Sequence, residues 1–442
     1  MNDTRNRERR FGVVTNILRS PKVWAPLFAV VLLAFFYFLV NFGVAKSPVA
    51  NTRDLPVAIV NEDAGATMGG ERVDLGERVA KSATSNGEIG NKVRWTRLQE
   101  RLDAVRSIAE GKYYGALVIP PDYSRSIAEL SVPSANGSLE PSRVEILTNP
   151  SAGPFASVTV QTILTEVVEG ASRATRERIA GTLEARSVQV SPRQAAALGE
   201  PVVAEVTDVQ PIGENSGRGL MPFYLMFTAL ILGFIGANAL YGGLTTFAGA
   251  VAARTGREPS MLQLFLAAMI LGLVLALLLG AVESLVAFGL YGVYHEAGVF
   301  YALSFLVLVS AVSLFLALVL LVALGPRGGI LTGSFLIISL GLATSGATTP
   351  VQNLPSFFRS LSGVLPFEHM TEGIRALLFY DGRLEAGLGA ALWVLAVYLL
   401  SSILLGGSIS LVRDTVTRRR KSSRGSARGT EGETAAVETG RR

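Results

Sequence analysis

Residues 260–290 read SMLQLFLAAMILGLVLALLLGAVESLVAFGL and contain one charged side chain, that of Glu283. As an α-helix this stretch would rise ~46 Å, against a bilayer hydrocarbon core of ~30 Å, so it is predicted to cross a membrane. Working outward along the chain, long apolar runs recur at 23–45, 219–243, 299–324, 329–349 and 386–412. The sequence therefore predicts an α-helical multi-pass membrane protein with six transmembrane helices.

Composition agrees with a membrane protein and excludes several other classes. Of the 442 residues, 49% are hydrophobic and 17% are charged, a balance that soluble domains seldom have. There is no cysteine, and the only histidines are His295 and His369, so no disulfide, thiolate nucleophile or metal site is expected. The excess of basic residues that gives a net charge of +5 sits mainly at the two ends, which excludes nucleic acid as an expected partner. The lipid bilayer is the expected partner, and no cofactor is expected.

Basic residues predict the orientation of the chain, because positively charged loops stay on the cytoplasmic side. Residues 1–22 are rich in arginine and carry apolar residues at helical spacing, which predicts a cytoplasmic interfacial helix before an uncleaved anchor at 23–45. The basic tail 413–442 is predicted to be disordered and cytoplasmic. Residues 46–218 are then extracytoplasmic in a bacterial cell membrane, and only the arginines of the outer hairpin 350–385 depart from the rule.

Residues 46–218 contain no run long enough to cross a membrane and alternate strand-like with helix-like patterns. They predict an α/β domain with a mixed sheet, inserted between the first and second transmembrane helices. Short segments rich in β-branched and aromatic residues predict strands at 55–61, 93–98, 113–119, 143–147 and 202–209. Helices are predicted at 71–84, 100–110, 122–130 and 154–188.

Three segments carry a resemblance to a known family. They are VAIVNEDAGA at 57–66, YYGALVIPPDYSRS at 113–126 and LPSFFRSLSGVLPFEHMTEGIRALLFY at 354–380. With the order of the predicted helices, they resemble the YhgE/Pip (phage-infection protein) family, a branch of the type-2 ABC exporter permeases. The resemblance implies an integral membrane protein of export or of the cell envelope. The nearest glycine-rich stretch, GPRGGILTG at 325–333, lacks the lysine of a phosphate-binding loop, so ATP hydrolysis would need a separate subunit.

A polar turn in the outer domain is the first candidate site. Asn61, Glu62, Asp63 and Gly65 follow a predicted strand, where carboxylates could hold a cation or a ligand amine. The alternative is turn chemistry, because Asn and Asp bond to nearby backbone and Gly tolerates positive φ. No base or nucleophile accompanies them, so the protein is not expected to be an enzyme.

A candidate transport path comes from polar residues within the predicted spans. They are Asn238, Glu283, Thr344, Ser345 and Thr348. Glu283 has two interpretations. It forms a cation or proton site within the membrane, or it lies on an over-long helix whose end lets its carboxylate reach the outer interface. Asn238 and the hydroxyls predict either bonds between helices or a lining of the path, and Gly329 with Gly333 predicts close helix packing.

Two further polar groups lie outside the spans. The inner loop with Arg254, Arg257 and Glu258 is a candidate docking point for a cytoplasmic partner, although the orientation rule alone explains arginines there. Within the outer hairpin 350–385, Glu368, His369, Glu372 and Arg375 predict a solvated turn, with a proton relay as the alternative.

Two classes of function remain open from the sequence. One is a membrane permease subunit of a type-2 ABC exporter-like system, paired as a homodimer or with a sister permease and driven by a separate ATPase. The other is an envelope interaction, secretion-accessory or phage-receptor protein, whose outer domain binds an envelope or phage ligand. A proton-driven carrier is third, because Glu283 is the only acidic residue well inside a predicted span.

Overall fold

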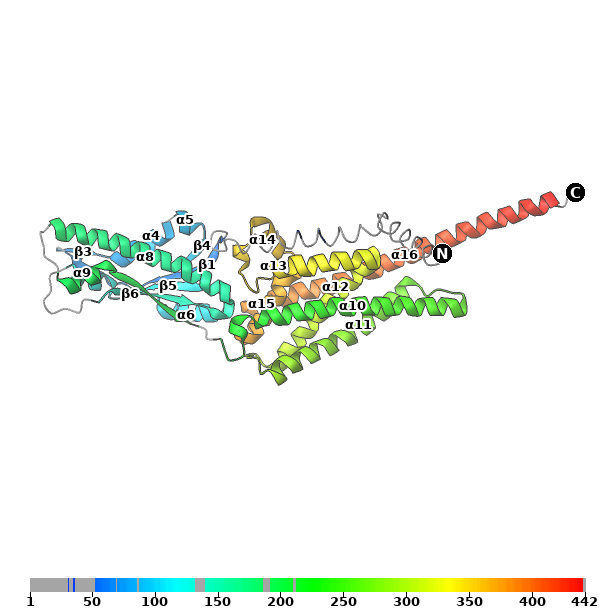
Figure 1. The fold of residues 1–442 in the computed structure, drawn as a ribbon, viewed down its shortest axis with the longest axis horizontal. Coiled ribbons are helices and arrows are strands. Elements are labelled where there is room, and N and C mark those ends of the chain that lie inside the picture. Colours follow the sequence, from blue (N-terminus) through cyan, green and yellow to red (C-terminus); the bar gives the residue numbers. More distant parts are fainter. Residues whose placement is uncertain are drawn as a thin grey trace, which may run out of the picture.

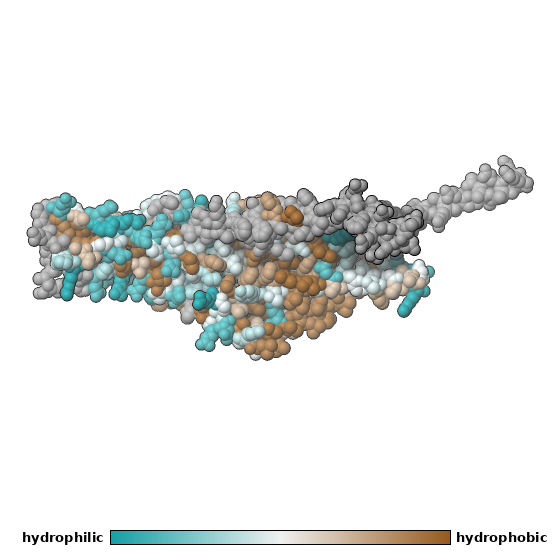
Figure 2. All heavy atoms as spheres, viewed as in Figure 1, coloured by the Kyte–Doolittle hydropathy of each residue, from teal (hydrophilic) through white to brown (hydrophobic). Residues whose placement is uncertain are grey.

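The computed structural model describes residues 31, 35, 52–68, 70–85, 87–131, 140–185, 191–209 and 212–439. The interfacial helix at 1–22 and nearly all of the predicted anchor at 23–45 therefore lie outside the described residues. The rest forms two parts joined end to end, an α/β domain and a bundle of long helices (Figure 1). Hydrophilic residues gather over the α/β domain and hydrophobic ones over the bundle (Figure 2).

The α/β domain is built on a five-stranded mixed sheet, and each of its strands coincides with a predicted one. The strands are β1 (Leu55–Asn61), β4 (Val93–Leu98), β5 (Gly115–Ile119), β6 (Ser142–Thr148) and β7 (Val202–Asp208). Their order is β4-β1-β5-β6-β7, and all neighbours are parallel except β5 and β6. Parallel pairing requires helical crossovers, which gives the domain its layers.

Helices cover both faces of this sheet. They are α4 (Leu75–Ser85), α5 (Gly87–Gly90), α6 (Arg101–Ala109), α7 (Tyr123–Leu130), α8 (Pro154–Ala185) and α9 (Pro192–Gly199). Alternate residues of β1 serve the two faces: Val57 and Ile59 join the core under α4, α7 and α8, while Ala58 and Val60 join the core under α6. The continuous apolar run of β1 thus contributes to two separate hydrophobic cores, because successive side chains of a strand point to opposite faces.

A small hairpin corrects the helix predicted at 71–84. Strands β2 (Ala66–Met68) and β3 (Glu71–Val73) pair antiparallel around Gly70, whose φ is +89°. The helix starts only at Leu75, where the Asp74 carboxylate accepts a hydrogen bond from the Glu77 N–H at 2.7 Å. Glycine allows the positive φ of the hairpin turn, and the aspartate marks the true helix start.

Four helical segments in the described part of the chain are long and apolar enough to cross a membrane: Met221–Thr255, Met261–Leu290, Val299–Thr344 and Leu388–Thr417. They correspond to α10 (Met221–Thr255), α11 (Met261–Ser284) with the π-helix η3 (Leu285–Leu290), α12 (Val299–Ser334) with the π-helix η4 (Phe335–Gly341) and α13 (Leu342–Thr344), and the first part of α16 (Leu388–Thr439). The total of six transmembrane helices stays a prediction.

The third segment bends back on itself between the predicted spans 299–324 and 329–349. Gly325 has φ 73° and ψ 175°, and Pro326 follows it. A Cβ added to Gly329 would lie 2.7 Å from the Cα of Leu321, whereas eight residues of straight helix span ~12 Å. The segment is therefore an antiparallel pair of limbs, and the two predicted spans correspond to these limbs.

The outer hairpin 350–385 lies between the bundle and the α/β domain (Figure 1). It contains η5 (Val351–Asn353), α14 (Ser356–Ser362), α15 (Pro366–Phe379) and η6 (Leu384–Ala386). Beyond it, α16 runs as helix to Thr439, and the disordered, cytoplasmic tail at 413–442 stays a prediction. No proline occurs after Pro366, so every residue of this helix can donate its backbone N–H.

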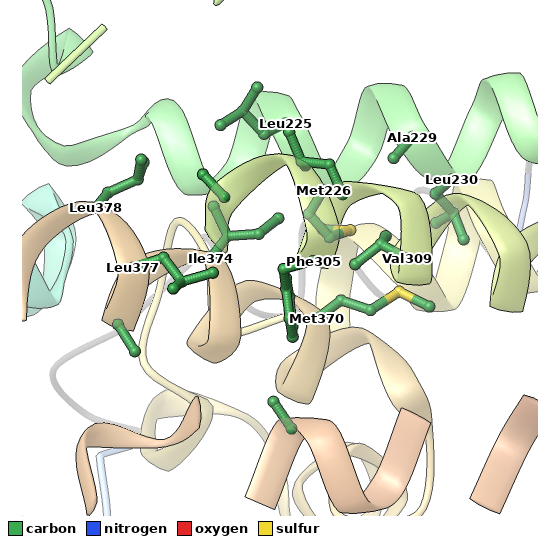
Figure 3. Packing of buried hydrophobic residues seen from close by; sticks show 14 of the residues in the cluster. Leu225, Met226, Ala229, Leu230, Phe305, Val309, Met370, Ile374, Leu377 and Leu378 are labelled. Carbon is green, nitrogen blue, oxygen red and sulfur yellow. The ribbon is translucent and has the colours of Figure 1, made fainter. Parts of the chain in front are cut away.

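The bundle core joins α10, α12 and α15. Met226 and Leu230 from α10 meet Phe305 from α12 and Met370 and Ile374 from α15 in one hydrophobic cluster (Figure 3). A Cβ on Gly373 would lie 2.1 Å from the Phe305 ring, so only glycine allows this approach of α15 to α12. The outer hairpin is thus part of the bundle core.

Candidate functional site

The polar turn after β1 caps two helices. One Asp63 carboxylate oxygen accepts the Gly76 N–H at 2.9 Å, at the start of α4, and the other accepts the Ser124 N–H at 2.9 Å, at the start of α7. The Ser124 hydroxyl also donates to Asp63 and accepts the Leu75 N–H at 2.8 Å. Helix N-termini carry partial positive charge, so this carboxylate occupies the place where an anion would bind.

The neighbours of Asp63 are also engaged in local structure. Glu62 accepts the Arg101 N–H at 2.8 Å at the start of α6, and Asn61 accepts the Asp63 N–H at 3.2 Å. Gly65 adopts φ +74°. The geometry is that of turn and capping chemistry, and it leaves no cluster of free carboxylates for a cation.

The residues of the candidate transport path do not form one polar group. No hydrogen bond or ion pair joins any two of Asn238, Glu283, Thr344, Ser345 and Thr348. The Asn238 amide donates to the Phe234 carbonyl of its own helix at 2.8 Å, and the Thr344 hydroxyl donates to the Leu340 carbonyl at 2.7 Å. The Ser345 hydroxyl donates to the Leu342 carbonyl at 3.2 Å, and Thr348 lies half-buried in the bend that follows. Donors that bond to their own helix need no partner across the bundle.

Glu283 differs from these residues. It is 8% exposed, and neither of its carboxylate oxygens has a hydrogen-bond partner among the described residues. It stands two residues before the π-helix η3, at the end of α11 that lies nearer to the α/β domain. A buried carboxylate without a partner is costly, and π-helical turns are frequent at functional sites, so Glu283 stays the strongest polar candidate within the bundle.

The candidate docking loop is exposed at the opposite end of the bundle (Figure 1). The helix α10 ends at Thr255, followed by Gly256 with φ +65°, and Arg254, Arg257 and Glu258 are exposed. The next helix starts with a capping box in which the Ser260 hydroxyl accepts the Gln263 N–H at 3.1 Å. Two well-formed helix ends therefore present this short charged loop at a fixed place.

The group on α15 is not the solvated turn predicted from the sequence. Arg375 is 8% exposed, and one of its Nη atoms donates to the Gly346 carbonyl at 3.1 Å. The His369 side chain is 17% exposed and that of Glu372 35%, with 3.7 Å between His369 Nδ1 and a Glu372 carboxylate oxygen. The α/β domain and the bundle both contribute to this burial, which sequence periodicity does not reveal.

The group on α15 adjoins a seam that we call the domain junction. It is made by polar residues of the α/β domain and of the outer hairpin, namely Thr52, Tyr114, Asn149, Thr159, Gln352, Asn353, Arg375 and Tyr380. The Thr52 hydroxyl donates to Asn353 Oδ1 at 2.9 Å, and Asn353 Nδ2 donates to the Thr159 hydroxyl at 3.2 Å. The Asn149 amide donates to the Tyr380 hydroxyl at 3.1 Å.

Burial in and beside the junction raises the pKa of several ionisable side chains. Burial, reinforced by the negative charge of Glu368, raises the pKa of the Glu372 carboxyl from 4.5 to about 7, while Arg375 opposes the change. Burial also raises the pKa of Glu368 and of Tyr114. These groups are therefore held closer to their neutral forms than they would be in water.

The sequence analysis missed the junction. Asn149 is 0% exposed although it directly follows β6, and Asn353 is 0% exposed in a loop next to Pro350 and Pro355. Amide side chains beside prolines are ordinary loop signals, and only the contact between segments about 200 residues or more apart buries them. No group of acidic and histidine side chains able to hold a metal occurs among the described residues.

Three comparisons with known proteins bear on this arrangement. A family model described as ABC-2 family transporter protein matches residues 23–412, which includes both parts of the structure. The chain is similar to the protein YhgE of Bacillus subtilis (strain 168), with 28% identity over 111 residues. That match covers 25% of this chain and 14% of YhgE. These two findings confirm the resemblance to YhgE and to type-2 ABC exporters.

A solved structure gives a weaker likeness. It is the crystal structure of a domain described as that of an ABC type-2 transporter from Thermotoga maritima MSB8. The two chains are 18% identical, and the match covers 35% of this chain and 86% of that chain with a TM-score of 0.22. A TM-score of this size carries no argument about the fold.

Proposed function

Because the chain belongs to the ABC-2 family of transporter proteins, we propose that it is the permease subunit of an exporter that moves its substrate out across the bacterial cell membrane. A permease of this family is not itself an enzyme, and such permeases typically pair with an ATPase and form dimers. In this proposal a separate subunit hydrolyses ATP. The chain itself crosses the membrane six times, with both termini cytoplasmic and residues 46–218 outside.

The domain junction is the observation that carries this proposal. An envelope interaction protein, whose outer domain is only anchored by its membrane helices, needs no buried polar interface between that domain and the helices. Here Asn353 accepts a hydrogen bond from Thr52 and donates one to Thr159, and α15, which lines the junction, is also part of the bundle core. These contacts support the proposal, in which movement of the bundle helices is passed to the outer domain as an alternating exporter requires.

The exposed loop between α10 and α11 is the proposed contact for the ATPase. Arg254, Arg257 and Glu258 stand at the end of the bundle opposite the α/β domain, where closure of an ATPase dimer would press. Glu283, at the end of α11 nearer the outer domain, is the residue proposed to face the substrate path. Pairing of two chains would complete that path.

Co-purification tests the proposal directly. The full-length protein is extracted from its native membrane in mild detergent, and we expect an ATPase subunit and a dimer in the isolated complex. The double variant Arg254→Glu/Arg257→Glu should lose the ATPase and keep the dimer. The matched control, Arg94→Glu/Arg125→Glu, changes two exposed arginines of the outer domain and should keep both.

The opposite result is equally clear. If the wild-type complex contains no ATPase, and a deletion strain retains no compound that the wild-type strain exports, the permease proposal is wrong. Retention of the ATPase by the double variant at wild-type levels would overturn the docking loop alone.

A further inference from the structure

The outer domain contains a cavity of about 380 Å³ between α4, α7 and α8. Its volume is in the range of pockets that hold small molecules. Residues of all three helices line it, together with Met68 of the β2–β3 hairpin. The cavity belongs to neither the domain junction nor the polar turn at Asp63.

The floor of the cavity is apolar. Leu75, Tyr123, Ile127, Val167 and Ile179 line it and are at most 8% exposed. These side chains come from three helices and already belong to one hydrophobic core. An apolar chain laid on them would leave water without displacing any packed side chain, which is favourable at roughly 25 cal/mol per Å².

The rim of the cavity is positively charged. Arg78 on α4 and Arg173 and Arg178 on α8 line it, against a single acid, Glu166. Arg78 and Arg173 are exposed, and Arg173 pairs only loosely with Glu169 at 3.8 Å. Guanidinium groups above an apolar floor match a ligand with an apolar chain and an anionic head.

A polar group also lies at the floor. The Tyr123 side chain is 0% exposed, and burial raises the pKa of its hydroxyl, while a weak interaction with the Thr175 side chain opposes the change. Buried hydroxyl groups normally have a partner. Tyr123 and Thr175 thus place two hydroxyl groups in the lining of the otherwise apolar floor.

We propose that this cavity binds an amphipathic anion, a molecule with a single acyl or alkyl chain and a phosphate or carboxylate head. The chain lies on Leu75, Ile127 and Val167, and the head meets Arg78 and Arg173. This proposal rests on the proposed export function in one respect: it identifies amphipathic anions as the class of substrate that reaches the outer domain during export.

The position of the cavity fits such a role. Thr159 of α8 touches Asn353 at the domain junction, and the cavity residues Glu166 to Ile179 follow on the same helix. At 1.5 Å per residue they lie roughly 10–30 Å beyond the junction, away from the bundle. In Figure 1, α8 runs from the junction to the far end of the α/β domain. A bound amphiphile has therefore left the membrane part.

Photolabelling of the full-length protein tests the site. The protein is placed in phosphatidylcholine nanodiscs and exposed to a diazirine-bearing dodecyl phosphate, a diazirine-bearing dodecanoic acid or a diazirine-bearing dodecyltrimethylammonium. Adducts are then mapped by mass spectrometry. We expect both anions to label peptides of α4, α7 and α8, and the cation to label them about fivefold less.

Variants separate the rim from the floor. Arg78→Glu should reduce anion labelling of these peptides about fivefold, whereas Arg125→Glu, an exposed arginine of α7 outside the cavity, should leave it unchanged. Ala83→Trp should block the cavity, and circular dichroism shows whether that variant folds. Equal labelling by the cation, equal labelling of Arg78→Glu and wild type, or adducts confined to the bundle would each overturn the site.

The result is independent of the exporter proposal. Arg78→Glu should keep the ATPase and the dimer in the isolated complex, because Arg78 lies in the outer domain, away from the loop between α10 and α11. Labelling of the cavity in a protein that has no ATPase partner would keep the binding site and reject export. If the complex contains the ATPase but the cavity is not labelled, the exporter proposal stands and the binding site is rejected.

Discussion

The Asp414 carboxylate accepts the backbone N–H of Met261 at 2.7 Å, so that α16 caps the N-terminus of α11. The second carboxylate oxygen accepts the Leu262 N–H at 3.1 Å. The neighbouring Arg413 donates to the Ala323 carbonyl at 3.0 Å, at the end of the first limb of α12. Adjacent residues of opposite charge thus meet helix ends of opposite polarity.

Replacement of Asp414 should therefore weaken the bundle. Asp414→Ala removes a charged cap from two N–H groups, and we expect a loss of ~1–2 kcal/mol in the free energy of unfolding. Thermal unfolding of the detergent-solubilised protein measures it. Thr417→Ala, whose hydroxyl bonds only to the Arg413 carbonyl of its own helix, is the control and should stay within ~0.5 kcal/mol of wild type.

Asp63 should be the more sensitive cap of the outer domain. Asp63→Ala leaves the first turns of α4 and α7 without their shared carboxylate, and we expect a loss of ~2–4 kcal/mol. The control is Asp122→Ala. Asp122 directly precedes α7 but its side chain makes no capping hydrogen bond, so its loss should cost ~0.5 kcal/mol or less. Similar losses for both variants in thermal unfolding would contradict the shared cap.

Glu372 should make stability depend on pH. Its folded pKa of about 7 lies above the ordinary value of 4.5, so the folded protein holds more protons than the unfolded chain between these values. Stability should then fall as pH rises from about 4.5 to about 7 and level off above that range. The side chain is 35% exposed, which moderates the effect.

Unfolding of wild type and Glu372→Gln across this pH range checks the sign. For Glu372→Gln, the free energy of unfolding should change less with pH than in the wild type, and its gain over the wild type should be larger near pH 7 than near pH 4.5. The control Glu100→Gln changes an exposed side chain and should show the pH dependence of the wild type. A profile for Glu372→Gln as steep as that of the wild type would show that another group titrates.

Gly325 should be required for the bend between the two limbs of α12. Its φ of 73° and ψ of 175° belong to a region that is essentially restricted to glycine, so Gly325→Ala should destabilise the pair of limbs by ~1–3 kcal/mol. Gly249→Ala in α10 meets no atom within 4 Å of the added Cβ and should be neutral or slightly stabilising. The yield and thermal stability of both variants are measured, and we expect both quantities to be lower for Gly325→Ala than for Gly249→Ala.

The sequence predicted the regular elements because their signals are local. The short run of β-branched residues in β1 and the long apolar run of α11 can each be read from the segment itself. The β2–β3 hairpin was not predicted, because its strands of three residues are too short to show a pattern of apolar and polar residues. Gly325 and Pro326 lie between the two predicted spans 299–324 and 329–349, where the structure has its sharp bend.

The candidate sites were harder to predict than the elements. The sequence revealed the polar residues of the turn at Asp63. It did not reveal that the N-termini of α4 and α7 both donate hydrogen bonds to the Asp63 carboxylate. The burial of Arg375 and Asn353 depends on segments that the sequence keeps far apart, so no periodicity reports it. The cavity in the outer domain likewise brings together α4, α7 and α8, and no single stretch contains its pattern.

The length of α8 turns the domain junction into the pivot of a lever. The 32 residues from Pro154 to Ala185 span about 48 Å, with the first turns held against Asn353 and Arg375 and the last turn at the far end of the outer domain. A tilt of about 5° at the pivot would swing that tip through about 4 Å. A shift of α15 that tilted α8 in this way would therefore move the end of the α/β domain farthest from the bundle by about the diameter of an atom.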